Sequence, residues 1–278
     1  MKFMRWIAIL VLTVISLMAQ GRIPWTDAEK PLFARIQKLR SLPDIERWPA
    51  TRSLALEIRR LPPSPGKDSL AIQLANLTTE GDPGQDTIQE SATTLAEALH
   101  AQPVKNDDPY FTLAQLVRYE QARVTLDDPR FLNALKTLEA DDQRREKLDF
   151  KLTSLDGKSW TLRQLKGNVV VINFWATWCP PCRKEMPDLA AIYKENRSKG
   201  LVVLAISDEE PAKVEAFLKE HPVSYTVLLD PGRKVNDLFV VRGIPKTFVY
   251  DRSGHLAAQS IDMRTKTQFM AMLKKAGL

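Results

Sequence analysis

Cysteine is scarce in this chain: there are two, Cys179 and Cys182, among 278 residues. A structural disulfide framework uses several cysteines that close long loops, so a disulfide-stapled scaffold is excluded. Zinc normally takes four ligands, and this pair with three scattered histidines, His100, His221 and His255, supplies no recognisable set. We therefore predict no metal and no cofactor, and we expect the two cysteines to act in chemistry rather than as a staple.

Long runs of one charge sign are also missing. The formal net charge is +6, and Lys2 and Arg5 supply two of those charges, so the chain without its first residues carries +4. This mild excess is spread among many acidic residues and gives no basis for nucleic acid binding.

Apolar runs long enough to span a membrane are absent too. After the two positive charges, residues 6–19 are apolar apart from Thr13 and Ser16. A spanning helix needs about 20 apolar residues, whereas a secretory signal core is shorter. Residues 1–20 are therefore expected to be a signal peptide or an uncleaved membrane anchor, with a buried N-terminal helix as the remaining alternative. The first two place the rest of the chain outside the cytoplasm.

Residues 24–146 are expected to form an all-helical domain. Apolar residues recur there at helical spacing, for example Leu54, Ile58 and Leu61, and Pro- and Gly-rich turns separate the segments. This pattern predicts a small bundle or a helical-repeat array. The apolar stripes are interpreted as core, although a groove for a partner remains open.

The domain is expected to end in the charged segment 141–147, which reads Asp-Asp-Gln-Arg-Arg-Glu-Lys. Dense charge of both signs at the end of a helix is typical of a solvated surface. We therefore predict a solvent-exposed helix end and a domain boundary here, with a second domain over 148–278.

After Leu148 strands and helices alternate. The continuous apolar run 168–175 is typical of a buried central strand, and a hairpin around an Asp-Gly turn is expected before it. Strand-helix-strand crossovers predict a parallel central pair, and the last hairpin an antiparallel edge. The expected strands are 149–153, 158–162, 168–175, 201–207, 225–229, 247–250 and 255–260, and the expected helices are 181–198, 210–220, 231–239 and 264–276.

The two cysteines lie where the predicted central strand ends and a helix begins, in Trp-Cys-Pro-Pro-Cys. Free N–H groups and the positive end of the helix dipole stabilise a thiolate there, so Cys179 is expected to have a lowered pKa and to be the nucleophile. Cys182 lies one turn later and can attack a mixed disulfide at Cys179. Pro181 suits the first helical turn, where no N–H is needed. An inert buried pair is the alternative.

From about Phe150 onward the sequence resembles the thioredoxin superfamily, most closely its TlpA/ResA-like extracytoplasmic branch. The resemblance rests on residues 165–175, on 178–187 (Trp-Cys-Pro-Pro-Cys-Arg-Lys-Glu-Met-Pro) and on 243–248 (Gly-Ile-Pro-Lys-Thr-Phe). It covers about half of the chain and implies a thioredoxin fold, with a central mixed sheet flanked by helices, behind the all-α domain. The helical region resembles no family that we can name.

The resemblance also implies roles for individual residues. Pro245 is implied to be the cis-proline that faces the cysteines and leaves the Ile244 backbone free to pair with a peptide. Trp178 and Pro180 are implied to share this substrate-binding surface. Glu185 is implied to tune the redox-active Cys179–Cys182 disulfide, and the alternative is an exposed helix glutamate.

One position departs from the thioredoxin pattern. Cytoplasmic thioredoxins carry a buried aspartate on the strand before the cysteines, and Asn173 occupies that place here. Because asparagine cannot ionise, a proton relay would have to use Glu185 or water. This departure agrees with the extracytoplasmic branch.

The implied activity is thiol–disulfide exchange with protein thiols and disulfides, as a reductant supplied by a membrane-embedded electron donor. A role in cytochrome c maturation follows from the family link alone. A disulfide-forming oxidant and a binding scaffold with the helical domain as interaction module are the alternatives. A peroxiredoxin-type peroxidase is disfavoured, because Ile172 and Ala176 stand where its Pro and Thr are needed. Oligomeric state is left open.

Overall fold

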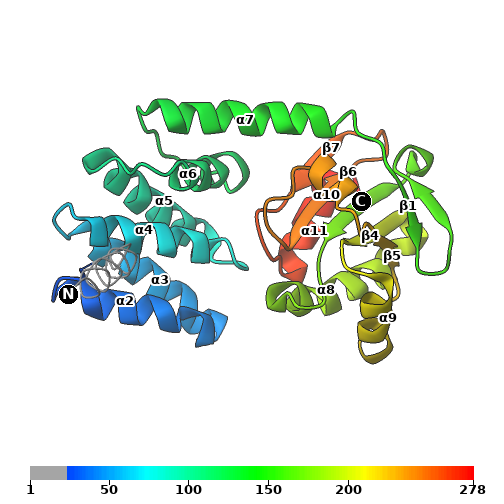
Figure 1. Ribbon diagram of the computed structural model, residues 1–278, viewed down its shortest axis with the longest axis horizontal. Helices are drawn as coiled ribbons and strands as arrows, with labels where there is room; N and C mark the ends of the chain where they lie inside the picture. The colour runs from blue at the N-terminus through cyan, green and yellow to red at the C-terminus, as the bar shows by residue number, and fades with distance from the viewer. Residues whose placement is uncertain (1–23) are drawn as a thin grey trace, which may run out of the picture.

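The computed structural model describes residues 24–278, so the predicted signal peptide or anchor lies outside the described residues. Helices fill the N-terminal half, and strands alternate with helices in the C-terminal half (Figure 1). The long helix α7, Pro129–Arg145, runs across from the helices to the sheet. Between residues 24 and 278, no helix is both long and apolar enough to cross a membrane.

The helical region forms because apolar stripes meet and polar side chains cap the helix starts. The Ser64 hydroxyl accepts a hydrogen bond from the Lys67 N–H at 2.9 Å, and Pro65 occupies the first turn. Leu54, Ile58 and the equivalent leucines of the neighbouring helices are almost fully buried, so the predicted stripes are core. The other helices are α2 (Glu29–Lys38), α3 (Asp44–Arg59), α4 (Pro65–Thr78), α5 (Gly84–Ala101) and α6 (Asp108–Tyr119).

The C-terminal half contains one seven-stranded sheet in the order β2-β1-β5-β4-β3-β6-β7. The central strand β3 is buried along its whole length and pairs in parallel with β4 and antiparallel with β6. The β6–β7 hairpin is the antiparallel edge that the sequence predicts. The strands are β1 (Lys151–Ser154), β2 (Ser159–Thr161), β3 (Val169–Phe174), β4 (Leu201–Ser207), β5 (Thr226–Leu229), β6 (Lys246–Tyr250) and β7 (Leu256–Gln259).

Helices cover both faces of this sheet. Alternate residues of β3 point to opposite faces, Val171 into one apolar cluster and Ile172 into another. The first cluster lies under α8 (Pro180–Asn196), α9 (Pro211–Glu220) and α11 (Lys266–Lys275), and the second lies under α10 (Lys234–Leu238). The mixed sheet flanked by helices is the predicted thioredoxin-like fold.

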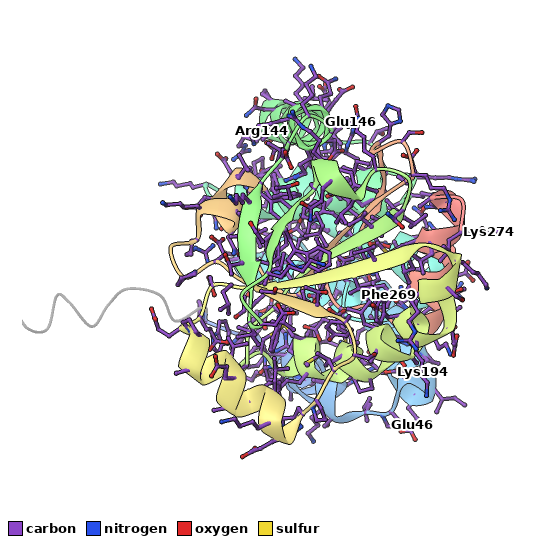
Figure 2. All side chains as sticks on the ribbon, turned by 90° about the vertical axis from the view of Figure 1, so that its right-hand side faces the viewer. Glu46, Arg144, Glu146, Lys194, Phe269 and Lys274 are labelled. Atoms are coloured by element: carbon purple, nitrogen blue, oxygen red, sulfur yellow. A yellow bond between two sulfur atoms is a disulfide. The ribbon has the colours of Figure 1, made fainter. Side chains whose placement is uncertain are left out.

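The prediction of a solvated helix end at 141–147 is wrong for Asp141, Asp142 and Arg145. Arg145 is buried, and its Nε donates to the Phe239 carbonyl oxygen at 2.9 Å. Its Nη1 lies 3.1 Å from Asp142 Oδ1. The charges pair with one another and with residues far away in the chain, which no local pattern reveals. The prediction is right for the exposed side chains of this segment, such as Arg144 and Glu146. Figure 2 shows these two residues at the end of α7, on the edge of the molecule.

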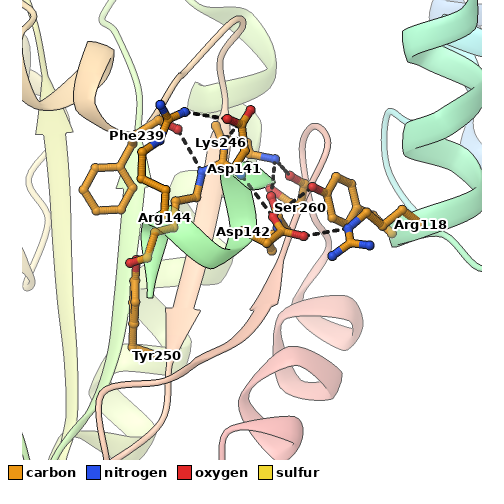
Figure 3. Close-up of polar contacts among 11 residues, drawn as sticks. Arg118, Asp141, Asp142, Arg144, Phe239, Lys246, Tyr250 and Ser260 are labelled. Atoms are coloured by element: carbon orange, nitrogen blue, oxygen red, sulfur yellow. Dashed lines mark hydrogen bonds and ion pairs between the residues drawn. The ribbon is translucent and has the colours of Figure 1, made fainter. Parts of the chain in front are cut away.

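Asp142 is the centre of this polar contact between α7, α6 and the sheet (Figure 3). Its carboxylate accepts hydrogen bonds from Arg118 Nε at 2.7 Å, from the Tyr119 hydroxyl at 3.0 Å and from Gln259 Nε2 at 2.6 Å. Lys246 is buried beside it and donates to the Ser260 carbonyl and to Gln259. Burial lowers the pKa of the Lys246 ammonium to about 7.

Candidate active site

Cys179 and Cys182 form a disulfide at the junction of β3 and α8, with their Cα atoms 5.3 Å apart. Cys179 is the N-cap of α8, and its Sγ accepts a hydrogen bond from the Cys182 N–H at 3.2 Å. Pro180 and Pro181 fill the first turn, where a missing N–H leaves no partner unsatisfied. Cys179 is 2% exposed and Cys182 is 0% exposed. The helix start therefore places the Cys182 N–H on the first sulfur.

Glu185, one turn past Cys182, is 2% exposed, so the alternative of an exposed helix glutamate is wrong. Its Oε1 accepts from Asn173 Nδ2 at 2.8 Å, and its Oε2 accepts from the Arg264 N–H at 3.0 Å. Burial raises the pKa of the Glu185 carboxyl to about 8, against the lowering effect of these two hydrogen bonds. The site thus contains a buried acid that changes protonation near neutral pH.

Asn173 is the next-to-last residue of β3, the strand that leads into the cysteine motif, and is itself buried. Its amide also donates to the Thr247 hydroxyl at 3.0 Å. The sequence relates Asn173 and Glu185 only in that Asn173 cannot carry a proton relay, which leaves Glu185 or water for that role. The structure brings them into contact, with Asn173 as a neutral hydrogen-bond donor to the carboxylate.

The cis-proline and the tryptophan before the cysteines are two further residues that the sequence predicts for this site. The Ile244–Pro245 peptide bond is cis, as predicted. Ile244 packs against the apolar cluster that contains both cysteines. Trp178 is 63% exposed and Pro180 is also exposed. An exposed indole beside a buried disulfide offers an apolar surface to an incoming chain.

Glu209 is a site residue that the sequence analysis missed. Its carboxylate accepts from the Thr177 N–H at 2.5 Å and from the Thr177 hydroxyl at 2.9 Å, so it fixes the loop two residues before Cys179. Burial alone would raise the pKa of Glu209, but hydrogen bonds from Lys213 and Thr177 outweigh it and hold the pKa below its usual value. Only its position after β4 could have signalled this role.

This arrangement suits thiol–disulfide exchange: two sulfurs three residues apart, an N–H donor on the first sulfur, and a buried acid one helical turn after the second. Among residues 24–278, His, Cys, Asp and Glu form no group of three or more that could hold a metal ion.

Comparison with known proteins agrees with this chemistry. Residues 144–259 match the AhpC/TSA family model. The thiol-disulfide oxidoreductase ResA of Bacillus thuringiensis (strain Al Hakam) is 36% identical over 132 residues, which cover 47% of this chain and 76% of that protein. ResA of Bacillus subtilis (strain 168) is 39% identical over 107 residues, which cover 38% of this chain and 60% of that protein.

Among solved structures, a thiol:disulfide interchange protein of the thioredoxin family from Chlorobium tepidum TLS is 31% identical, with a TM-score of 0.41 over 46% of this chain and 92% of that one. Identity above a third across three quarters of the Bacillus thuringiensis protein establishes the relationship. The chain belongs to the ResA family, and its C-terminal half is a thiol–disulfide oxidoreductase.

Proposed function

We propose that Cys179 is the attacking sulfur and Cys182 the resolving sulfur of a protein-disulfide reductase. The hydrogen bond from the Cys182 N–H to Cys179 Sγ carries this assignment, because an N–H donor at a helix start stabilises negative charge on that sulfur. In the first step the Cys179 thiolate bonds to one sulfur of a partner disulfide, and the other partner sulfur leaves as a thiolate.

In the second step Cys182 loses its proton and attacks Cys179 Sγ. The Cys179–Cys182 disulfide forms, and the second partner thiolate leaves. We assign the proton to Glu185, whose pKa near 8 is close to that of a free thiol. Proton transfer between groups of similar pKa is efficient, which supports this role over that of the neutral Asn173.

We further propose that Trp178, Pro180 and Ile244 bind the partner chain, with Pro245 fixing the Ile244 backbone. The exposure of the first two residues supports this surface. The apolar N-terminal stretch supports export, either as a cleaved signal or as an anchor. An exported reductant needs electrons from across the membrane, so a membrane-embedded donor is proposed as one of its partners. Separate apolar cores support distinct domains, 24–146 and 148–278.

Trapping of mixed disulfides tests the assignment of the two sulfurs. Cys182→Ser leaves no thiol to resolve the intermediate, so it should accumulate covalent adducts with partner proteins that disappear on reduction. Cys179→Ser should trap almost nothing, because the helix-start N–H stabilises a thiolate at position 179, whereas Cys182 lies fully buried one turn later. Non-reducing gels of tagged full-length variants give the readout, and equal trapping by both variants would contradict the assignment.

The equilibrium of the cysteine pair with glutathione tests the direction of electron flow. A reductant is expected to have a potential nearer the about −270 mV of thioredoxin than the about −120 mV of a strong oxidant such as DsbA. A value at the oxidising end would assign the chain to disulfide formation instead.

A further inference from the structure

The segment 263–268, which ends in the first turn of α11, contacts both the active site and the helical region. On one side the Arg264 N–H donates to Glu185 Oε2 at 3.0 Å, and the Lys266 N–H donates to Asp188 Oδ2 at 3.0 Å. These two bonds attach the segment to α8. The N–H of Arg264 is one of the two donors on the Glu185 carboxylate.

On the other side the helical region holds the same segment at three points. The Gly81 N–H donates to the Met263 carbonyl oxygen at 3.2 Å, and Gln268 Nε2 donates to the Gly81 carbonyl oxygen at 2.8 Å. Between them, the Arg264 guanidinium forms an ion pair with Glu120, at the C-terminal end of α6. Residues 263–268 therefore lie between α8 and the N-terminal helices.

The Arg264–Glu120 pair is shielded from water, with 6% and 12% of the two side chains exposed. A buried guanidinium that loses its carboxylate must find another partner or move toward solvent. The main-chain N–H of the same residue is bonded to Glu185, so a movement that reaches the main chain of Arg264 shifts this donor.

We propose that Glu120 is a positioning residue for the thiol chemistry: by holding the Arg264 side chain, the helical region keeps the Arg264 N–H on the Glu185 carboxylate. The inference rests on the function proposed above, in which Glu185 takes the proton of Cys182. The N-terminal helices would then help to determine the protonation of the active-site acid Glu185.

Losing the contact between Arg264 and Glu120 should change the pKa of Glu185 in a direction that can be predicted. The charged and titratable groups near it are Asp262, Arg264 and Tyr225, besides Cys182 on its own helix. A hydrogen bond from an N–H favours the ionised carboxylate, so losing the Arg264 N–H raises the pKa of Glu185. If Glu120 acted only through its charge, removing that charge would favour the Glu185 carboxylate and lower the pKa.

The test is Glu120→Gln in the full-length oxidised protein, with the Glu185 carboxyl titrated by carbon-13 NMR and its signal assigned by its loss in Glu185→Gln. We expect the pKa of Glu185 to rise by on the order of one unit. The pH profile of disulfide exchange should move to higher pH with it. Arg264→Lys, which keeps a cation for Glu120 and the main-chain N–H, should stay near the wild-type value.

Matched variants separate this inference from its alternatives. Glu57→Gln removes a comparable carboxylate, paired with Arg35 between α2 and α3, and should leave the Glu185 titration unchanged. Glu120→Gln combined with Arg264→Met should shift the pKa no more than Arg264→Met alone, because the pair acts as a unit. If Glu120→Gln alone folds poorly, the pKa of Glu185 in Arg264→Met and in the double variant still tests the ion pair.

An unchanged or lowered pKa in Glu120→Gln would overturn the positioning role, and the function proposed for Glu185 would stand as long as Glu185→Gln shifts the exchange profile. If Glu185→Gln leaves that profile unchanged, the proposed relay itself fails.

Discussion

Glu185→Gln is expected to remove most of a fall in stability that the wild-type protein shows between about pH 4.5 and pH 8. Asp68 and Asp262, whose pKa values burial raises to about 6, account for the remaining fall below pH 6. The folded-state pKa of Glu185 is raised from 4.5 to about 8, so the folded protein holds a proton that the unfolded chain releases. The resulting stabilisation is complete below pH 4.5 and is lost as the pH rises to 8. Each pKa unit corresponds to about 1.4 kcal/mol, so the full loss is on the order of 5 kcal/mol.

Glutamine mimics the neutral acid and has no proton to lose, so the variant should become more stable than the wild type at high pH. Urea unfolding of the oxidised proteins from pH 4 to pH 9 gives the measurement, because the disulfide removes cysteine titration from the comparison. Glu195→Gln, on the exposed part of the same helix, should keep the wild-type fall. If the free energy of unfolding of Glu185→Gln and of the wild type changes with pH in the same way, the raised pKa of Glu185 in the folded protein is refuted.

Arg145→Ala should lower the free energy of unfolding by about 3 kcal/mol. Only 4% of the Arg145 side chain is exposed, and its loss leaves the buried Phe239 carbonyl oxygen without a donor. Two carboxylates, Asp141 and Asp142, lose a cation, and the Phe248 ring loses the guanidinium 5.0 Å from its centre. Several contacts between α7 and the sheet disappear together.

The adjacent Arg144 supplies the control. It lies on the same turn of α7, its side chain is 52% exposed, and it forms an ion pair with Asp141. An exposed pair contributes less than about 1 kcal/mol, so Arg144→Ala should leave stability nearly unchanged. Denaturant unfolding of both variants at pH 7 makes the comparison. Similar losses from the two substitutions would mean that α7 is not fixed to the sheet through Arg145.

Elements with local signals were predictable from sequence. The buried run of β3 and the strand-to-helix turn at Cys179 depend on neighbouring residues, so the fold and the cysteine pair could be inferred directly. The thioredoxin resemblance singles out Asn173 and Glu185, but their hydrogen bond joins a strand to a helix and no local pattern predicts it. The burial of Arg145 could not be inferred, because its acceptor Phe239 is 94 residues away and dense charge is usually solvated.

The polar character of the contact between the two halves has a consequence for chain synthesis. Asp142 and Glu120 are made early, whereas their partners Gln259 and Arg264 lie 117 and 144 residues later. Nascent chains fold from the N-terminus as they emerge, so α6 and α7 exist before β7 and α11. During that interval water can solvate the two carboxylates. A large apolar face at the same place would instead have been exposed to aggregation until the last residues appeared.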